Sequence, residues 1–408
     1  MAIAFRNQNL DKNPNLKDSK KPWNQDIDFP KNNNISNDIN TILVGDLFIW
    51  KGIALSQDYL RTINEDQRDE INKDILNYLL QYNFSKLSFA KKDIKTSWES
   101  LCKIDTPIDL IDGVKHITNS SSSGNKVYRH YFPNILKVRG DKRASIYDVL
   151  SNKDSLWKVI RNRSGNTLLY NDDPKGIPVQ YPMPMNISQI TIGAKNSGLS
   201  SMASIFKPSV AKAIYKTYVK PGDKVLDYSC GFGTRLLGLM SLKNNNLYCG
   251  YEPNTETYDN LLKMSKDYNF NVEIKCSGSE TGDLFNHEFD FVFSSPPFFT
   301  AELYVLEETQ SVIKFPEYSS WIESYWRQTV KNCKQMMKKD AIFGINIGSE
   351  ANELMSKLKT DMTNVVLEEN LELIDTWYMK TSKSHLSGKK GDTSKKVKLE
   401  GIYFYRMK

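Results

Sequence analysis

The feature that most constrains the fold is a regular alternation of strand-like and helix-like segments over residues 196–408. Short apolar runs such as 225–229, 247–253 and 289–295 are separated by longer segments with helical apolar spacing, such as 255–268. Strands that alternate with helices form a parallel sheet with helices on both faces. We therefore predict an α/β fold whose ligands bind at the carboxyl ends of the strands.

The 408 residues leave room for two or three domains. Residues 1–40 are polar and predict a flexible arm. Residues 41–195 contain a strand-like run at 42–50 and helical spacing at 69–82, which predict an N-terminal α+β region. The sequence has no run of about eighteen apolar residues. Its beginning lacks the apolar core of a signal peptide, so we expect a cytoplasmic protein without a membrane span.

The formal net charge of +7 suits a polyanionic partner but does not require one. The five cysteines include no Cys-x-x-Cys pair, and the four histidines stand far apart in the sequence. This pattern predicts neither a disulfide framework nor a metal site.

Two glycines, Gly231 and Gly233, lie one residue apart between the strand 225–229 and the next helical segment. Glycines at such a turn let the backbone approach a ligand closely. A pyrophosphate-binding fingerprint would need a further glycine at position 236, where the chain has leucine, and no Gly-Lys-Ser or Gly-Lys-Thr follows. Glu252 ends the second strand, where a carboxylate can accept hydrogen bonds from both hydroxyls of a ribose.

An acid at the first strand end, a glycine turn, an acid at the second strand end and a polar third strand end (276–280) occur in this order. The set resembles the cofactor half of class I S-adenosylmethionine-dependent methyltransferases. The resemblance implies a Rossmann-like sheet that is mostly parallel with an antiparallel last strand, and S-adenosyl-L-methionine as cofactor. The usual Asp-Pro-Phe opening of the glycine motif is Asp227-Tyr228-Ser229 here. The cofactor-binding residues implied by the resemblance are Phe206, Pro208, Asp227, Ser229, Gly231, Gly233, Thr234, Glu252 and Glu280.

The fourth strand runs into Ser295-Pro296-Pro297-Phe298. Neither proline can donate a hydrogen bond to a neighbouring strand, so one interpretation is a simple strand terminator. However, the motif follows a strand at the expected ligand-binding edge, and an aromatic residue comes directly after it. It is similar to the Asp/Asn/Ser-Pro-Pro-Tyr/Phe/Trp signature of amino-methyltransferases, a resemblance that covers residues 196–408. Ser295, Pro296, Pro297 and Phe298 are the catalytic residues that it implies.

The chemistry of amine methylation suits these residue types. The Ser295 hydroxyl and the Pro296 carbonyl can each accept a hydrogen bond from an exocyclic amine, which localises its lone pair for attack on a methyl group. Phe298 can stack on a base that has left the duplex. Methylation of a cytosine ring carbon would need a thiolate, which follows a proline in that family, and no Pro-Cys dipeptide occurs here. In the amino-methyltransferases, serine in the first position favours cytosine over adenine.

Lysines are concentrated between residues 380 and 399, next to the expected catalytic edge. Such a loop is either a solvated hairpin or a set of phosphate contacts. We predict that Lys389, Lys390, Lys395 and Lys396 bind nucleic acid. Target recognition is expected within 41–195, where aromatic and cationic residues alternate over 128–143. That segment could equally be the surface of a structural domain.

We therefore expect methyl transfer from S-adenosyl-L-methionine to the exocyclic amine of a base in DNA, with cytosine N4 favoured over adenine N6. Two alternatives remain. One is an RNA amino-methyltransferase with the same motifs. The other is an inactive cofactor-fold module that only binds nucleic acid.

Overall fold

A computed structural model describes residues 41–44, 47–82, 84, 89–118, 120–139, 143–165, 185–200, 205–301, 303–304, 307–348, 352–380 and 399–408. The chain divides into two compact units, one from residues 1–89 and 142–202 and the other from residues 90–141 and 203–408. The predicted arm over residues 1–40 lies outside the described residues.

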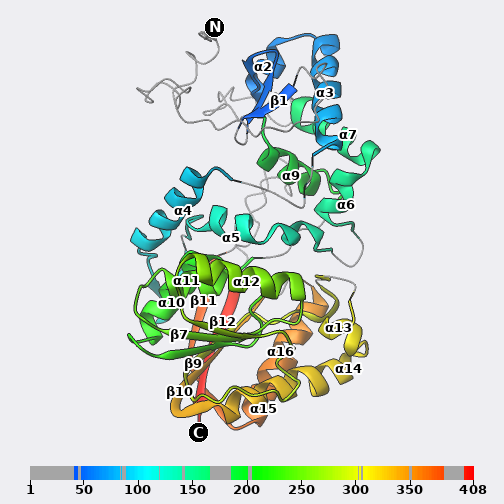
Figure 1. Cartoon of the computed structure of the whole chain (residues 1–408). Coiled ribbons are helices and arrows are strands. Elements are labelled where there is room, and N and C mark those ends of the chain that lie inside the picture. Colours follow the sequence, from blue (N-terminus) through cyan, green and yellow to red (C-terminus); the bar gives the residue numbers. More distant parts are fainter. Residues whose placement is uncertain are drawn as a thin grey trace. The chain divides into compact units, whose positions relative to one another are not determined.

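The smaller unit combines a three-stranded sheet with a group of helices (Figure 1). The elements are β1 (Thr41–Val44), β2 (Leu47–Trp50), β3 (Ile53–Ala54), α2 (Gln57–Thr62), α3 (Glu65–Leu80), α6 (Ile146–Ser151), α7 (Lys153–Gly165) and α9 (Ile187–Asn196). The run 42–50, predicted as one strand, is two strands, because β1 and β2 pair antiparallel with Thr41 opposite Trp50. Asn64 caps the start of helix α3, because its side chain accepts a hydrogen bond from the Gln67 N–H.

The larger unit is built around a nine-stranded sheet in the order β4-β5-β11-β12-β10-β9-β6-β7-β8. The strands are β4 (Asp109–Ile111), β5 (Val114–Ile117), β6 (Lys224–Asp227), β7 (Leu247–Tyr251), β8 (Val272–Lys275), β9 (Phe289–Ser294), β10 (Met337–Ile347), β11 (Leu371–Lys380) and β12 (Leu399–Met407). Strands β8, β7, β6, β9 and β10 run parallel, whereas β12 is antiparallel to both β10 and β11. The predicted Rossmann-like sheet, mostly parallel with an antiparallel last strand, is confirmed.

Helices cover both faces of this sheet (Figure 1). They are α10 (Pro208–Tyr218), α11 (Thr234–Met240), α12 (Thr255–Asp267), α13 (Ser311–Lys314), α14 (Tyr318–Ser320), α15 (Gln328–Gln335) and α16 (Glu353–Glu368), with a 3-10 turn η3 (Phe299–Ala301) and a π-helix η4 (Trp321–Arg327). Consecutive residues of a strand point to opposite faces. Accordingly, Phe404 of β12 contacts Tyr218 of α10, whereas Tyr405 contacts Phe343, which also contacts Trp326 of the π-helix.

Residues 90–141 pack with the sheet, which differs from the predicted boundary between 195 and 196. Strand β5 pairs in parallel with β11, so the sheet is two strands wider than the segment 203–408 alone supplies. The segment also contains α4 (Lys91–Lys103), α5 (Asn125–Tyr131) and η2 (Pro133–Lys137). The Lys212 ammonium of α10 donates to the carbonyls of Leu101, Cys102 and Ile104 at 2.7–2.8 Å. These bonds satisfy free carbonyls at the end of α4 and hold it against α10.

Among the described residues, no helix is both long enough and apolar enough to cross a membrane.

Candidate active site

A cavity opens where the ends of β6, β7, β8 and β9 meet the loops that follow them. Its lining includes Ser229, Glu252, Ser279 and Ser295, one residue from each of the four connections. Because the carboxyl ends of parallel strands meet at one edge of a sheet, this is the position predicted for a ligand. The cavity lies entirely within the larger unit.

The two glycines of the turn have different roles. Gly231 lines the cavity with a φ of 54°, and an added Cβ would have only the Ser229 carbonyl oxygen within 4 Å, at 3.9 Å. The space beside Gly231 is therefore open to a ligand. Gly233 has a φ of 63°, but its Cβ would come within 3.0 Å of Leu261, Met264 and Phe132. Gly233 is required by packing and does not contact the cavity.

Asp227 lies behind the turn and is fully buried. Its carboxylate accepts hydrogen bonds from Arg235 Nε, Tyr248 Oη and Ser294 Oγ, each at 2.7 Å, and from the Ser229 N–H at 3.1 Å. An ionised carboxylate has about four acceptor positions, so these partners occupy them all. The structure therefore assigns Asp227 to holding the turn in place, whereas the sequence predicted a direct contact with the cofactor.

Glu252 lines the cavity directly after β7 and is 8% exposed. One carboxylate oxygen accepts from the Gly231 N–H at 2.8 Å, and the other from the Asn254 N–H at 3.0 Å. Burial raises the pKa of Glu252 to about 7, although the two backbone N–H groups oppose this rise. Both oxygens keep further lone pairs, so the group can still accept hydrogen bonds from a ligand with paired hydroxyls.

The loop after β8 adds a charged pair to the cavity. Glu280 is part of the lining, and its carboxylate accepts a hydrogen bond from the Lys314 ammonium of α13 at 2.7 Å. Ser279, its neighbour, is held from both sides, because its hydroxyl bonds Thr329 at 2.9 Å and its carbonyl accepts from Asn332 at 2.8 Å. The loop that follows β8 is therefore polar and held in place by hydrogen bonds.

Ser295 and Pro297 line the cavity, so two residues of the Ser-Pro-Pro-Phe motif face the same space as Glu252. The Ser295 hydroxyl donates a hydrogen bond to Asn346 Oδ1 at 3.0 Å. Pro296 is not among the lining residues.

Phe298 does not lie where the sequence predicted. Its side chain is 7% exposed and belongs to the hydrophobic core, beside Met355 of α16 and the backbone at Gly348. Burying this apolar ring gains more free energy than leaving it exposed to solvent. Stacking of Phe298 on a base would require this side chain to leave the core.

The remaining predicted cofactor residues divide into two groups. Phe206, Ser229 and Thr234 line the cavity. Pro208 begins α10 and is buried, at a position where proline loses no helical hydrogen bond. Tyr228, where the chain has tyrosine in place of the proline of the resembled motif, is one of the lining residues, and its ring is buried in the core. It stacks on Phe343 at 5.4 Å and donates to the Gly344 carbonyl at 3.1 Å.

Several lining residues were not among the predicted site residues, and four of them show how the cavity is completed. Tyr325 comes from the π-helix, an element that often occurs at functional sites. Its hydroxyl is 3.5 Å from Ser229 Oγ. Tyr304 and Phe232 bring aromatic rings whose centroids are 6.1 Å apart. Asn134 comes from η2, in the segment 90–141. Phe232 lies within the glycine turn itself, whereas no local sequence pattern marks Tyr325, Tyr304 or Asn134, because the fold joins loops that are distant in the chain.

Nucleic-acid binding was predicted for the lysines between 380 and 399 and for the segment 128–143. Lys389, Lys390, Lys395 and Lys396 lie outside the described residues. Within 128–143, Tyr128 and Tyr131 are buried, and Lys137 forms a 2.8 Å ion pair with Glu256 of α12. These contacts fit the second interpretation of that segment, the surface of a structural domain.

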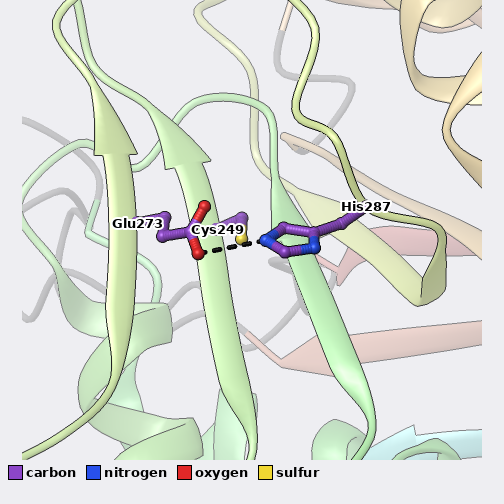
Figure 2. Close-up of side chains that lie close together, drawn as sticks. All are labelled: Cys249, Glu273 and His287. Atoms are coloured by element: carbon purple, nitrogen blue, oxygen red, sulfur yellow. Dashed lines mark hydrogen bonds and ion pairs between the residues drawn. The ribbon is translucent and has the colours of Figure 1, made fainter.

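Three possible metal ligands that are far apart in the sequence come together outside the cavity (Figure 2). Atoms of Cys249, Glu273 and His287 lie within 4.8 Å of one another. The Lys224 ammonium, which can only donate, is 3.4 Å from His287 Nδ1, so Nε2 carries the proton that is donated to Glu273 at 3.0 Å. Burial also raises the pKa of the Cys249 thiol to about 12. A hydrogen-bonded chain explains this cluster better than a metal site does.

Comparison with protein-family models finds no match, and comparison with curated proteins finds none either. Among solved structures, a methyltransferase from Pyrococcus furiosus is 13% identical and covers 52% of this chain and 92% of its own (TM-score 0.33). A TehB-like SAM-dependent methyltransferase from Corynebacterium glutamicum is 14% identical, covering 54% and 96% (TM-score 0.33). TrmN from Thermus thermophilus is 10% identical, covering 49% of each chain (TM-score 0.34).

Proposed function

We propose that the chain is an S-adenosylmethionine-dependent methyltransferase that modifies the exocyclic amine of a base in DNA, with cytosine N4 favoured over adenine N6. The observation that carries the proposal is that Glu252 and Ser295 line one cavity at the carboxyl ends of β7 and β9. This single cavity offers a carboxylate suited to ribose hydroxyls and a hydroxyl suited to an amine.

Three features of the cavity fit S-adenosyl-L-methionine. Gly231 leaves open space at the turn, and Glu252 offers two acceptor oxygens. Oδ1 of Asn134 is buried without a hydrogen-bond partner among the described residues, so a donor group on a ligand would remove the cost of that unpaired acceptor. When bound, this cofactor supplies a methyl group activated by a sulfonium centre.

The residues on the other side of the cavity suit a base amine. The lone pair of such an amine is delocalised into the ring, so the amine is a poor nucleophile. A hydrogen bond accepted by the Ser295 hydroxyl would localise that lone pair, and the two prolines that follow Ser295 keep this acceptor fixed. Holding the amine in line with the methyl group supplies most of the remaining rate enhancement, up to about 7–11 kcal/mol in favourable cases.

The net charge of +7 supports a nucleic acid as the substrate. The proposal assigns phosphate contacts to the lysines between 380 and 399 and target recognition to the region 41–195. A cytoplasmic location is part of it.

The proposal is tested by incubating the purified chain with isotopically labelled S-adenosyl-L-methionine and either DNA or RNA. Nucleosides are then analysed by mass spectrometry. Label in N4-methylcytosine from DNA supports the proposal. Label in RNA alone would favour the RNA amino-methyltransferase, and cofactor binding without any methylated nucleoside would favour the inactive module.

A further inference from the structure

Asn346 is a polar residue in the middle of an apolar, buried strand. It lies in β10 between Ile345 and Ile347, and it is only 3% exposed. A buried amide is costly unless its groups are hydrogen-bonded. Both ends of this side chain have partners. Nδ2 donates to the Gly401 carbonyl of the adjacent strand β12 at 3.2 Å, and Oδ1 accepts from Ser295 Oγ at 3.0 Å (Figure 1 shows β10 and β12).

These two bonds fix the direction of the hydrogen bond to Ser295. The Gly401 carbonyl can only accept, so the NH2 end of the Asn346 amide must face it. The oxygen end of the amide must then face Ser295, and it too can only accept. The proton of the Ser295 hydroxyl is therefore committed to Asn346.

A serine hydroxyl has one proton and two lone pairs. An unconstrained serine could donate to a keto oxygen or accept from an amine. Since the proton of Ser295 is occupied and this residue lines the cavity, only its lone pairs are available to a group held there. The hydrogen bond to Asn346 therefore leaves the Ser295 hydroxyl, which could otherwise donate or accept, as an acceptor only.

We propose that Asn346 is a positioning residue that holds Ser295 as a hydrogen-bond acceptor, so that the site selects a substrate amino group over a keto oxygen. This inference rests on the proposed methyltransferase function. Asn346 itself does not line the cavity, so it acts through Ser295 rather than on the substrate.

The test is a double-mutant cycle with Asn346→Ala, Ser295→Ala and the double variant. The rate constant for methylation of DNA and the calorimetric affinity for S-adenosyl-L-methionine are measured for each. Asn346→Ala should lower the rate by about tenfold or more, as happens when residues that orient a reacting group are removed, and should leave cofactor affinity unchanged. In the Ser295→Ala background, Asn346→Ala should have almost no further effect on the rate, because the group it orients is gone.

Asn246→Leu is a matched control. Asn246 is also a buried asparagine whose Nδ2 donates to backbone carbonyls, those of Lys220 and Asp223, but it does not line the cavity. This variant should lose stability without losing rate. Asn346→Leu, which fills the space left by the amide, serves if Asn346→Ala does not fold.

The outcomes separate the two claims. Rate losses of Asn346→Ala and Ser295→Ala that multiply in the double variant would overturn the positioning role while leaving the methyltransferase intact. A loss of cofactor affinity that matches the loss of rate would also overturn it. A native chain that methylates neither DNA nor RNA would overturn the proposed function itself, and the positioning role with it.

Discussion

At the scale of single residues, Glu252 should make ligand binding in the cavity depend on pH. Its pKa of about 7 means that the carboxylate is largely ionised at pH 8 and largely protonated at pH 6. A ligand whose hydroxyls donate to this group binds the ionised form. Affinity for S-adenosyl-L-methionine should therefore fall as pH drops below 7, by at most about tenfold per pH unit.

Calorimetry of cofactor binding between pH 6 and 8 measures this effect. Near pH 7, binding should also release a proton, which appears as a dependence of the heat on the buffer. Glu252→Gln should bind more weakly and show neither effect. Equal affinities at pH 6 and pH 8 in the native chain would contradict the role of Glu252.

The raised pKa of Glu252 has the opposite effect on folding stability, which should increase as pH falls. The unfolded group has an ordinary value near 4.5, so the folded protein binds the proton more tightly. Ionised Glu252 therefore destabilises the unliganded fold above pH 7, and this cost disappears as pH falls toward 4.5. Replacing Glu252 with Gln should raise the free energy of unfolding at pH 8 relative to the native chain.

Phe298 leads to a prediction that separates core packing from base stacking. Because its side chain is buried among core residues, Phe298→Ala should lower the free energy of unfolding by about 3–5 kcal/mol. Phe298→Leu should restore much of that loss. Urea denaturation of both variants measures it. Unchanged stability together with weaker substrate binding would instead support the stacking role that the sequence predicted.

At the scale of elements, the glycine turn after β6 should be the most sensitive part of the cofactor site. Gly231→Asp puts a negative charge into the open space of the cavity, so it should abolish cofactor binding in a folded protein. Gly222→Asp is the matched control. Gly222 also has a positive φ, of 85°, and has open space beside it, but it does not line the cavity. If Gly231→Asp binds the cofactor as Gly222→Asp does, the cavity is not the cofactor site.

The elements also show how far the sequence alone could lead. The strands and helices from 208 to 294 agree closely with their predicted ranges, because their apolar periodicity reflects burial in one sheet. The pairing of β5 with β11 joins positions about 260 residues apart, as with Lys115 opposite Trp377, and no local pattern carries that information. The hairpin at β1 and β2 was missed although the sequence signals it, since Gly45-Asp46 separates two apolar runs and such a pair is typical of a two-residue hairpin turn.

The site shows the same division. The sequence could predict that Gly231, Glu252 and Ser295 lie close together. Each follows a strand, and the carboxyl ends of parallel strands meet at one edge of the sheet. Tyr325 and Asn134 reach the cavity only through tertiary packing. Asp227 has the expected position but a different task, since the hydrogen bonds around a buried carboxylate depend on partners from three other segments.

At the scale of the whole molecule, the lysine loop should determine affinity for the phosphate backbone. Replacing Lys389, Lys390, Lys395 and Lys396 with Gln should weaken DNA binding equally for every sequence. The slope of log affinity against log salt concentration should flatten by up to about four units. Fluorescence anisotropy over a series of salt concentrations measures both quantities. An unchanged slope and affinity would mean that the loop is only a solvated hairpin.

We propose that the protein transfers a methyl group to a base amine that is bound in the cavity and donates a hydrogen bond to Ser295. The most direct measurement is mass spectrometry of nucleosides from DNA treated with labelled S-adenosyl-L-methionine and either the native chain or Ser295→Ala. We expect labelled N4-methylcytosine, or N6-methyladenine, with the native chain, and a rate on the order of a hundredfold lower with Ser295→Ala at nearly unchanged cofactor affinity. Full methylation by Ser295→Ala would contradict this proposal, because the Ser-Pro-Pro-Phe motif would then only end a strand.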